Sequence, residues 1–144
     1  MKSLLKALLA LFVLTANAFA HGGGEAEIEV GPDKGVIEIT KDKAFKLAPE
    51  AKQTFGLKAI PYTSGPITLP NRAIVHALKE SQIFRLRGDY LKIVHFKTVK
   101  QTEQSIVIES HELQSGDQVV TDGVGFLRII AAQVGEEEEA DHHD

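Results

Sequence analysis

Short runs of β-branched and aromatic residues, separated by turn residues, occupy the chain from Ala73 onward and restrict its fold more than any other feature. Two of the turns are marked by Arg87-Gly88-Asp89 and Ser115-Gly116-Asp117. Strands favour β-branched and aromatic side chains, whereas Gly, Asp and Ser favour turns. The sequence therefore predicts strands at 73–78, 82–86, 90–99, 105–109, 118–121 and 126–131.

The stretch before Ala73 predicts a few more strands and a single helix. Strands are expected at 36–40, 57–62 and 67–69. Pro49 suits the first turn of a helix and Gly56 suits its end, so we expect one short helix over 49–55. Many short strands with one short helix predict a mainly-β fold, a compact β-roll or small barrel.

Residues 1–20 have the features of a secretory signal peptide. Lys2 and Lys6 form a positive n-region, an apolar run extends to Leu14, and Ala18-Phe19-Ala20 provides the small-x-small pattern that signal peptidase recognises. The apolar run is shorter than the roughly 20 residues that a membrane span needs. We predict cleavage after Ala20 and a periplasmic product with no membrane span; the alternative is an uncleaved amphipathic anchor.

Composition narrows the classes of function. Removing residues 1–20 takes away two lysines and no acidic residue, so the formal net charge changes from −4 to −6. An acidic chain without a basic patch is not expected to bind nucleic acid, because phosphate contacts provide most of that affinity. Cysteine is absent, which excludes disulfides, thiolate metal sites and a lipoprotein anchor.

The two ends of the mature chain differ from its centre in composition. Residues 21–34 are rich in Gly and Glu and predict a disordered lead-in. Residues 135–144 form an acidic, His-containing tail, which we also expect to be disordered because like charges repel. One folded domain is expected between them, over 35–134.

Several motifs resemble one protein family. Leu69-Pro70-Asn71-Arg72-Ala73-Ile74-Val75, Gln82-Ile83-Phe84-Arg85-Leu86 and the run from Leu113-Gln114-Ser115-Gly116-Asp117 to Gly123 are similar to the membrane-proximal segment of periplasmic adaptor subunits (membrane fusion proteins) of RND-type efflux pumps. Residues 36–65, with Leu47-Ala48-Pro49-Glu50 followed by Gly56-Leu57, resemble the opening segment of the heavy-metal branch. The resemblance implies a periplasmic partner of an RND transporter or of its full-length adaptor.

The chain also departs from that family. A full adaptor carries a β-barrel domain, a lipoyl-like domain and a helical hairpin between the two segments, whereas here only a few residues around Ser64–Leu69 separate them. In full adaptors the first and last segments meet in space to build the membrane-proximal domain. The resemblance therefore implies that this chain is the membrane-proximal domain alone.

The ends of the chain contain candidate metal ligands. After cleavage, His21 would present both its amine and its imidazole to a divalent metal, with Glu25 and Glu27 nearby. The second candidate set is Asp141, His142, His143 and Asp144. With no Cys or mature-chain Met, such sites would favour Zn(II), Ni(II), Co(II) or Cu(II) over Cu(I). The alternative is a flexible terminus and a solubilising tail, and no other cofactor is expected.

The remaining polar residues have weaker functional interpretations. His76, His95 and His111 are expected to be ordinary strand residues. The polar turn around Arg87, with Arg85, Asp89 and Tyr90, is either a solvated hairpin or part of a rim that meets a transporter. Hydrolase, metalloprotease and phosphate-loop motifs are absent, so the sequence predicts no enzyme.

Two hypotheses follow from different classes of function. The first is an interaction module that docks on the periplasmic face of an RND transporter; it predicts an exposed apolar or mixed patch on the domain. The second is a periplasmic metal-binding protein that uses its His-bearing tails. A folded remnant without further function is the third alternative.

Overall fold

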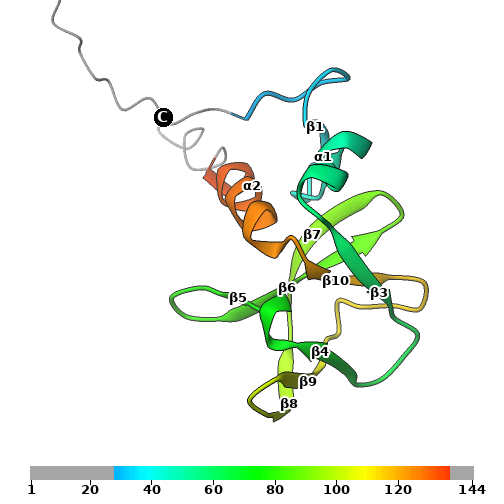
Figure 1. Cartoon of the computed structure of the whole chain (residues 1–144), viewed down its shortest axis with the longest axis vertical. Helices are drawn as coiled ribbons and strands as arrows, with labels where there is room; N and C mark the ends of the chain where they lie inside the picture. The colour runs from blue at the N-terminus through cyan, green and yellow to red at the C-terminus, as the bar shows by residue number, and fades with distance from the viewer. Residues whose placement is uncertain (1–27, 137–144) are drawn as a thin grey trace, which may run out of the picture.

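The computed structural model describes residues 28–136 and has a mainly-β architecture with two sheets (Figure 1). The larger sheet contains, in spatial order, β1 (Val36–Ile39), β2 (Phe45–Leu47), β7 (Tyr90–His95), β6 (Ser81–Arg87), β10 (Gln118–Asp122) and β3 (Lys58–Pro61), with β5 (Val75–His76) also paired to β6. The smaller sheet contains β4 (Ile67–Pro70), β9 (Ser105–Glu109) and β8 (Lys97–Gln101). The helices are α1 (Pro49–Thr54), the 3₁₀ turn η1 (Asn71–Ala73) and α2 (Val124–Glu136).

The larger sheet separates two apolar cores. On β10, Val120 belongs to the first core, which also contains Leu127 of α2, while Val119 belongs to the second. Successive side chains in a strand point to opposite faces, so consecutive apolar residues indicate burial on both faces. Ile83 and Phe84 of β6 divide between the cores in the same way. Helices α1 and α2 lie on one side of this sheet and the smaller sheet on the other (Figure 1).

Strand β10 joins the first and last parts of the chain. It pairs with β3 through Val120 and Ala59, and with β6 through Val119 and Arg85, both in antiparallel register. Strand β2 similarly pairs with β7, where Phe45 lies opposite Leu91. Strands from before and after the turn at 64–66 therefore share the larger sheet.

A buried ion pair fixes the turn that precedes β10. The Asp117 side chain is 1% exposed and accepts hydrogen bonds from Arg87 Nε at 2.8 Å and Nη2 at 2.9 Å. The backbone N–H of Gln114 donates a third bond, at 2.8 Å. Burial alone would raise the pKa of Asp117, but these hydrogen bonds and the positive charge of Arg87 lower the pKa below its ordinary value. The carboxylate therefore holds the turn to the end of β6.

The C-terminal element is a helix, so the predicted strand at 126–131 is wrong. Residues Ile129 and Ile130 favour a strand by propensity, but the buried residues of α2 have helical spacing. Val124, Leu127 and Val134 are buried against the first core, which stabilises the helix by tertiary packing.

Two further differences concern the strands. The predicted strand at 90–99 is two strands, because the chain leaves the larger sheet at Phe96 and enters the smaller sheet as β8. Strand β2 was not expected, since its three residues precede α1 directly. The predicted mainly-β fold is confirmed, as is the short helix at 49–55, which the structure has as α1.

The folded part also extends beyond the predicted limits. Ile28 packs against the first core, and Gly31 N–H donates to the Val36 carbonyl at 3.0 Å, so the lead-in predicted at 21–34 is ordered from Ile28. Helix α2 continues to Glu136, past the expected end of the domain at 134. Within residues 28–136, no helix combines the length and the apolar character that crossing a membrane requires.

Replacing the buried carboxylate should destabilise the domain. We expect Asp117→Asn to lower the free energy of unfolding by about 2 kcal/mol at neutral pH, because Arg87 loses its charged partner. Asp89→Asn is the matched control: Asp89 forms ion pairs with Lys46 and Lys52, but its side chain is 60% exposed. The Asp89→Asn substitution should lower the free energy of unfolding by less than about 1 kcal/mol. Urea denaturation measures both values.

The effect of Asp117→Asn should also depend on pH. Because the pKa of Asp117 is lowered in the folded state, the stabilisation is complete above the unfolded carboxyl pKa of about 4 and is lost as the pH falls through the lowered value. The difference between wild type and Asp117→Asn should therefore shrink below about pH 4. A difference that stays constant from pH 7 to acid would contradict this assignment.

Candidate functional site

The residues predicted to bind metal lie outside the described part of the chain. These are His21, Asp141, His142, His143 and Asp144, together with the neighbouring Glu25 and Glu27. Between Ile28 and Glu136, no group of three or more His, Cys, Asp or Glu residues could hold a metal ion. The metal hypothesis therefore depends on the tails alone.

The histidines of the domain have separate partners. His95 Nε2 lies 2.9 Å from Glu80 Oε2, and its Nδ1 lies 3.2 Å from Glu112 Oε2. His76 Nδ1 lies 3.3 Å from the Ser81 hydroxyl. Both ring nitrogens of His95 lie at hydrogen-bonding distance from carboxylates. The His95 side chain therefore links Glu80, in the loop before β6, to Glu112, in the loop after β9.

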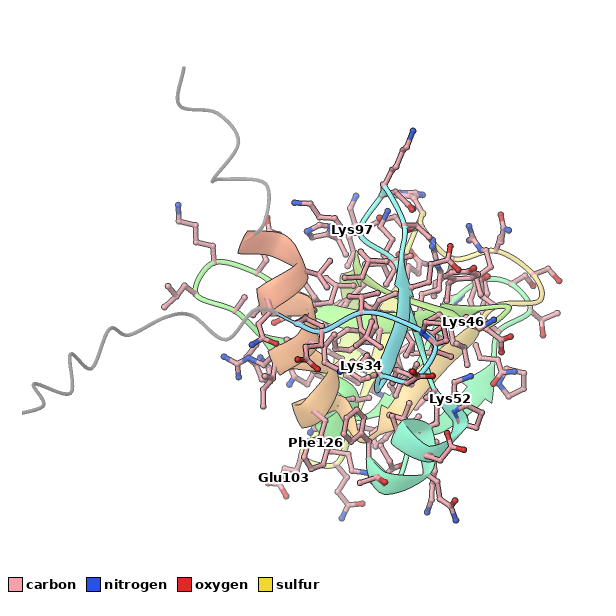
Figure 2. All side chains as sticks on the ribbon, turned by 90° about the horizontal axis from the view of Figure 1, so that it is seen from above. Lys34, Lys46, Lys52, Lys97, Glu103 and Phe126 are labelled. Carbon is pink, nitrogen blue, oxygen red and sulfur yellow. The ribbon has the colours of Figure 1, made fainter. Side chains whose placement is uncertain are left out.

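The polar turn considered as a transporter rim has partners within the domain. Arg85 Nη1 donates to the Glu112 carbonyl at 3.2 Å, and the Tyr90 hydroxyl donates to Glu38 at 2.8 Å. Asp89 lies 3.7 Å from Lys46 Nζ and 3.4 Å from Lys52 Nζ; Figure 2 shows both lysines on the same side of the molecule. Arg85 therefore links β6 to the loop after β9, whereas Asp89 and Tyr90 link the turn between β6 and β7 to β2, α1 and β1.

Helix α2 has a second apolar surface that faces solvent. Phe126 is 51% exposed and Ile129 is 60% exposed, on the side opposite the buried Leu127. The α2 face is defined here as Gly125, Phe126, Ile129, Ala132 and Gln133. A surface helix normally carries charged or polar residues on its outer side, whereas here only Gln133 is polar and none of the five is charged.

An aromatic stack fixes one edge of the α2 face. The rings of Phe55 and Phe126 lie 4.8 Å apart between centroids, with an angle of 10° between their planes. Figure 2 shows Phe126 near the start of α2 at the surface of the helical layer. A hollow of about 490 Å³ lies beside this stack, with Arg72 and Asp122 on its polar side. Arg72 Nε donates to Asp122 at 2.8 Å, a contact that lowers the pKa of Asp122.

A second exposed feature lies on the other flank of α2. The loop between β5 and β6 projects from the body of the domain (Figure 1), and the side chain of Leu78 in it is fully exposed. Together with Lys79, Glu80 and Arg128 of α2, Leu78 lines a hollow of about 570 Å³. The hairpin surface, defined as Leu78, Lys79, Glu80 and Arg128, is thus mixed apolar and charged.

Sequence reasoning missed both surfaces. The sequence predicted a strand at 126–131, in which every second residue would be buried. With that prediction, Phe126 and Ile129 could not be recognised as neighbours on the outer side of a helix. The spacing of Val124, Leu127, Ala131 and Val134 is the helical signal that could have revealed it. Phe126 and Ile129 then remain as apolar residues that the core does not use.

Comparisons with protein-family models, with curated proteins and with solved structures find no match to this chain.

The close approach of α2 to the end of α1 depends on one glycine. Gly123 has φ +84°, and a Cβ there would lie 2.8 Å from the Phe55 carbonyl oxygen and 2.5 Å from Leu57 Cδ2. We expect Gly123→Ala to cost about 3 kcal/mol of unfolding free energy, from backbone strain and steric overlap together.

Gly116→Ala is the matched control for this prediction. Gly116 also has a positive φ, of +92°, but a Cβ there would meet nothing within 4 Å. The Gly116→Ala variant should therefore lose only about 1 kcal/mol of unfolding free energy, from backbone strain alone. Urea denaturation measures the unfolding free energy of both variants. Equal decreases would show that steric overlap with Phe55 and Leu57 adds nothing to the cost at Gly123.

Proposed function

We propose that this protein is a periplasmic, non-catalytic interaction module of the adaptor type. It docks on the periplasmic face of an RND-type transporter, or on that transporter's full-length adaptor. We expect this transporter to belong to a heavy-metal efflux system. The proposal rests on the sequence resemblance to membrane-proximal domains and on the topology of the described residues.

The pairing of the two chain segments is the observation that carries the proposal. The resemblance implies that the first and last segments of an adaptor meet to form the membrane-proximal domain. Here β3 and β2, from the first segment, pair with β10 and β7 from the last. A chain that lacks the intervening domains can still build this unit, because only the short stretch 62–66 links β3 to β4.

The hairpin surface is the part of the domain that we propose as the contact with the transporter. An interaction module was expected to expose an apolar or mixed patch, and this surface places Leu78 beside Lys79 and Glu80 on a projecting loop. A fully exposed Leu stabilises nothing within the domain, but its burial in a partner would contribute about 2 kcal/mol. The neighbouring charges would fix the orientation of docking.

Recovery from the cell envelope tests this proposal. After mild cross-linking in its own cells, the mature protein should bring down an RND transporter or its full-length adaptor, identified by mass spectrometry. Leu78→Ser should reduce that recovery at least severalfold, because the apolar contact is lost.

The control for the recovery experiment is Val99→Ser. Val99 is another exposed apolar residue, but it lies on the edge strand β8, away from the hairpin surface. Its substitution should leave recovery unchanged. Recovery of no inner-membrane protein by the wild type would overturn the proposal, and equal losses for both variants would overturn the assigned surface.

Metal binding by the tails is the second candidate function, favoured by the position of the two ends of the domain. In both figures the first described residues lie at the same end of the molecule as the last turn of α2. Val134 belongs to the first core and Ile28 packs against it. The first and last described residues therefore lie at one end of the domain, which favours one divalent ion shared by ligands from the two tails.

Calorimetric titration with Zn(II), Ni(II), Co(II) and Cu(II) tests the second candidate. The protein purified from the periplasm should bind one of these ions stoichiometrically, and the combined His21→Ala, His142→Ala and His143→Ala variant should lose that binding. A matched variant with His76, His95 and His111 replaced by Ala should retain it. Binding that survives loss of the tail histidines would contradict this function.

A further inference from the structure

We infer that His95 is a pH-dependent switch that controls the hairpin surface. The protonated ring binds Glu80 and holds the loop between β5 and β6 in place, whereas the neutral ring releases Glu80 and accepts a hydrogen bond from Gln82 instead. This inference rests on the proposed function, because it concerns the regulation of docking through the same surface. The switch itself is a property of the domain, so it can be tested without a partner.

Two carboxylates compete for protons on the His95 ring. Its Nε2 lies 2.9 Å from Glu80 Oε2, and its Nδ1 lies 3.2 Å from Glu112 Oε2. An ionised carboxylate only accepts hydrogen bonds, and both ring nitrogens of histidine are donors only in the protonated form. The ring can therefore donate both of these hydrogen bonds when it is protonated, and it must give up one of them when it is neutral.

Gln82 provides an alternative partner for Nε2. It lies directly opposite His95 in the pairing of β6 with β7, and its side-chain nitrogen is 3.2 Å from Nε2 of the ring. An amide NH₂ group is a donor, so it pairs with a ring nitrogen that has lost its proton. Because Glu80 and Gln82 lie within reach of the same nitrogen, the exchange between them requires no rearrangement of the strands.

Glu112 keeps the other nitrogen protonated. The carboxylate oxygen that faces Nδ1 also accepts a hydrogen bond from the His95 backbone N–H at 2.7 Å. Burial alone would raise the pKa of Glu112, but the hydrogen bonds from the His95 backbone and ring and the positive charges of His95 and Lys92 lower the pKa below its ordinary value. Glu112 is therefore an acceptor throughout the range of about pH 5 to 8 in which imidazole titrates. We expect the neutral ring to keep its proton on Nδ1 and to lose it from Nε2.

The remaining polar groups near the ring have a fixed charge in this range. Arg85 and Arg87 donate to the backbone carbonyl of Glu112, at 3.2 Å and 3.4 Å. The Ser110 hydroxyl donates to the backbone carbonyl of His95. Arginine, lysine and serine side chains do not titrate near neutral pH. The protonation of His95 is therefore the variable at this site.

Release of Glu80 should loosen the hairpin. Residues 76–80 are all exposed, so packing contributes little to the position of this loop. The N–H of Ala77 donates to the Glu80 carbonyl at 2.9 Å and closes the turn, whereas the contact of Glu80 with His95 attaches the turn to β7. A loop that is already ordered binds a partner more tightly than one that is ordered on binding. Docking should therefore be stronger at about pH 5.5 than at about pH 8.

Nuclear magnetic resonance of the purified, ¹⁵N-labelled full chain tests the switch. Exposed charge pairs contribute little to global stability, so a local measurement is the sensitive one. As the pH rises from about 5 to about 8.5, the His95 ring should change from two N–H groups to the Nδ1–H tautomer. The backbone order parameters of residues 77–80 should fall in parallel, from about 0.85 to below about 0.6.

Two results of this titration would overturn the inference. A neutral ring with its proton on Nε2 would still donate to Glu80, so nothing would be released. Order parameters that stay constant while His95 titrates would show that the contact does not hold the loop.

Variants separate His95 from the other histidines of the domain. Glu80→Ala should leave the loop mobile at every pH, although the ring still titrates. His76→Gln and His111→Gln are the matched controls, because His76 contacts Ser81 in the same hairpin and His111 precedes Glu112. Both controls should keep the response to pH. A response that survives Glu80→Ala but is lost in either control would assign the switch to a different histidine and contradict the inference.

Photo-cross-linking connects the switch to docking. In isolated cell envelopes, a photoreactive amino acid at position 78 should give severalfold more transporter or adaptor adduct at pH 5.5 than at pH 8, and Glu80→Ala should abolish the difference. Equal yields at both pH values in the otherwise wild-type protein would overturn the regulation of docking. The absence of adducts at both pH values would contradict the proposed function, and the titration of His95 would still decide whether the switch exists.

Discussion

The position of β10 between β6 and β3 is the constraint on which the rest of the structure depends. Its pairing with β3 attaches the first segment of the chain, and its pairing with β6 attaches the last. Val119 and Val120 contribute to different cores, so this one strand also holds the helical layer and the smaller sheet to the same central layer. A strand buried on both faces tolerates neither a shift in register nor a polar substitution.

The elements around β10 fix both of its ends. The Arg87–Asp117 pair holds the preceding turn against β6. Gly123 then lets the chain pass close to Phe55 and Leu57 and start α2 immediately. Because α2 starts there, one side of it covers the first core while the other side carries Phe126 and Ile129 to the surface. The same local geometry thus completes the domain and creates its uncovered apolar face.

Much of the sheet could be predicted from sequence because turn residues and β-branched runs act locally. The break at Phe96 could not, since it reflects a change of sheet that only tertiary contacts determine. Helix α2 was missed because Ile129-Ile130 favours a strand by local propensity, whereas packing against the first core decides in favour of helix. The predicted metal ligands, among them His21 and His142, lie outside residues 28–136, so the tail hypothesis stays a prediction.

Photo-cross-linking from position 78 in living cells is the most direct test of the central claim, that this domain is an adaptor-like module docking through its projecting hairpin. A photoreactive amino acid at Leu78 should form a covalent adduct with an RND transporter or its full-length adaptor, and the same probe at Val99 should not. Adducts that are absent from position 78, or that form equally from position 99, would contradict the account.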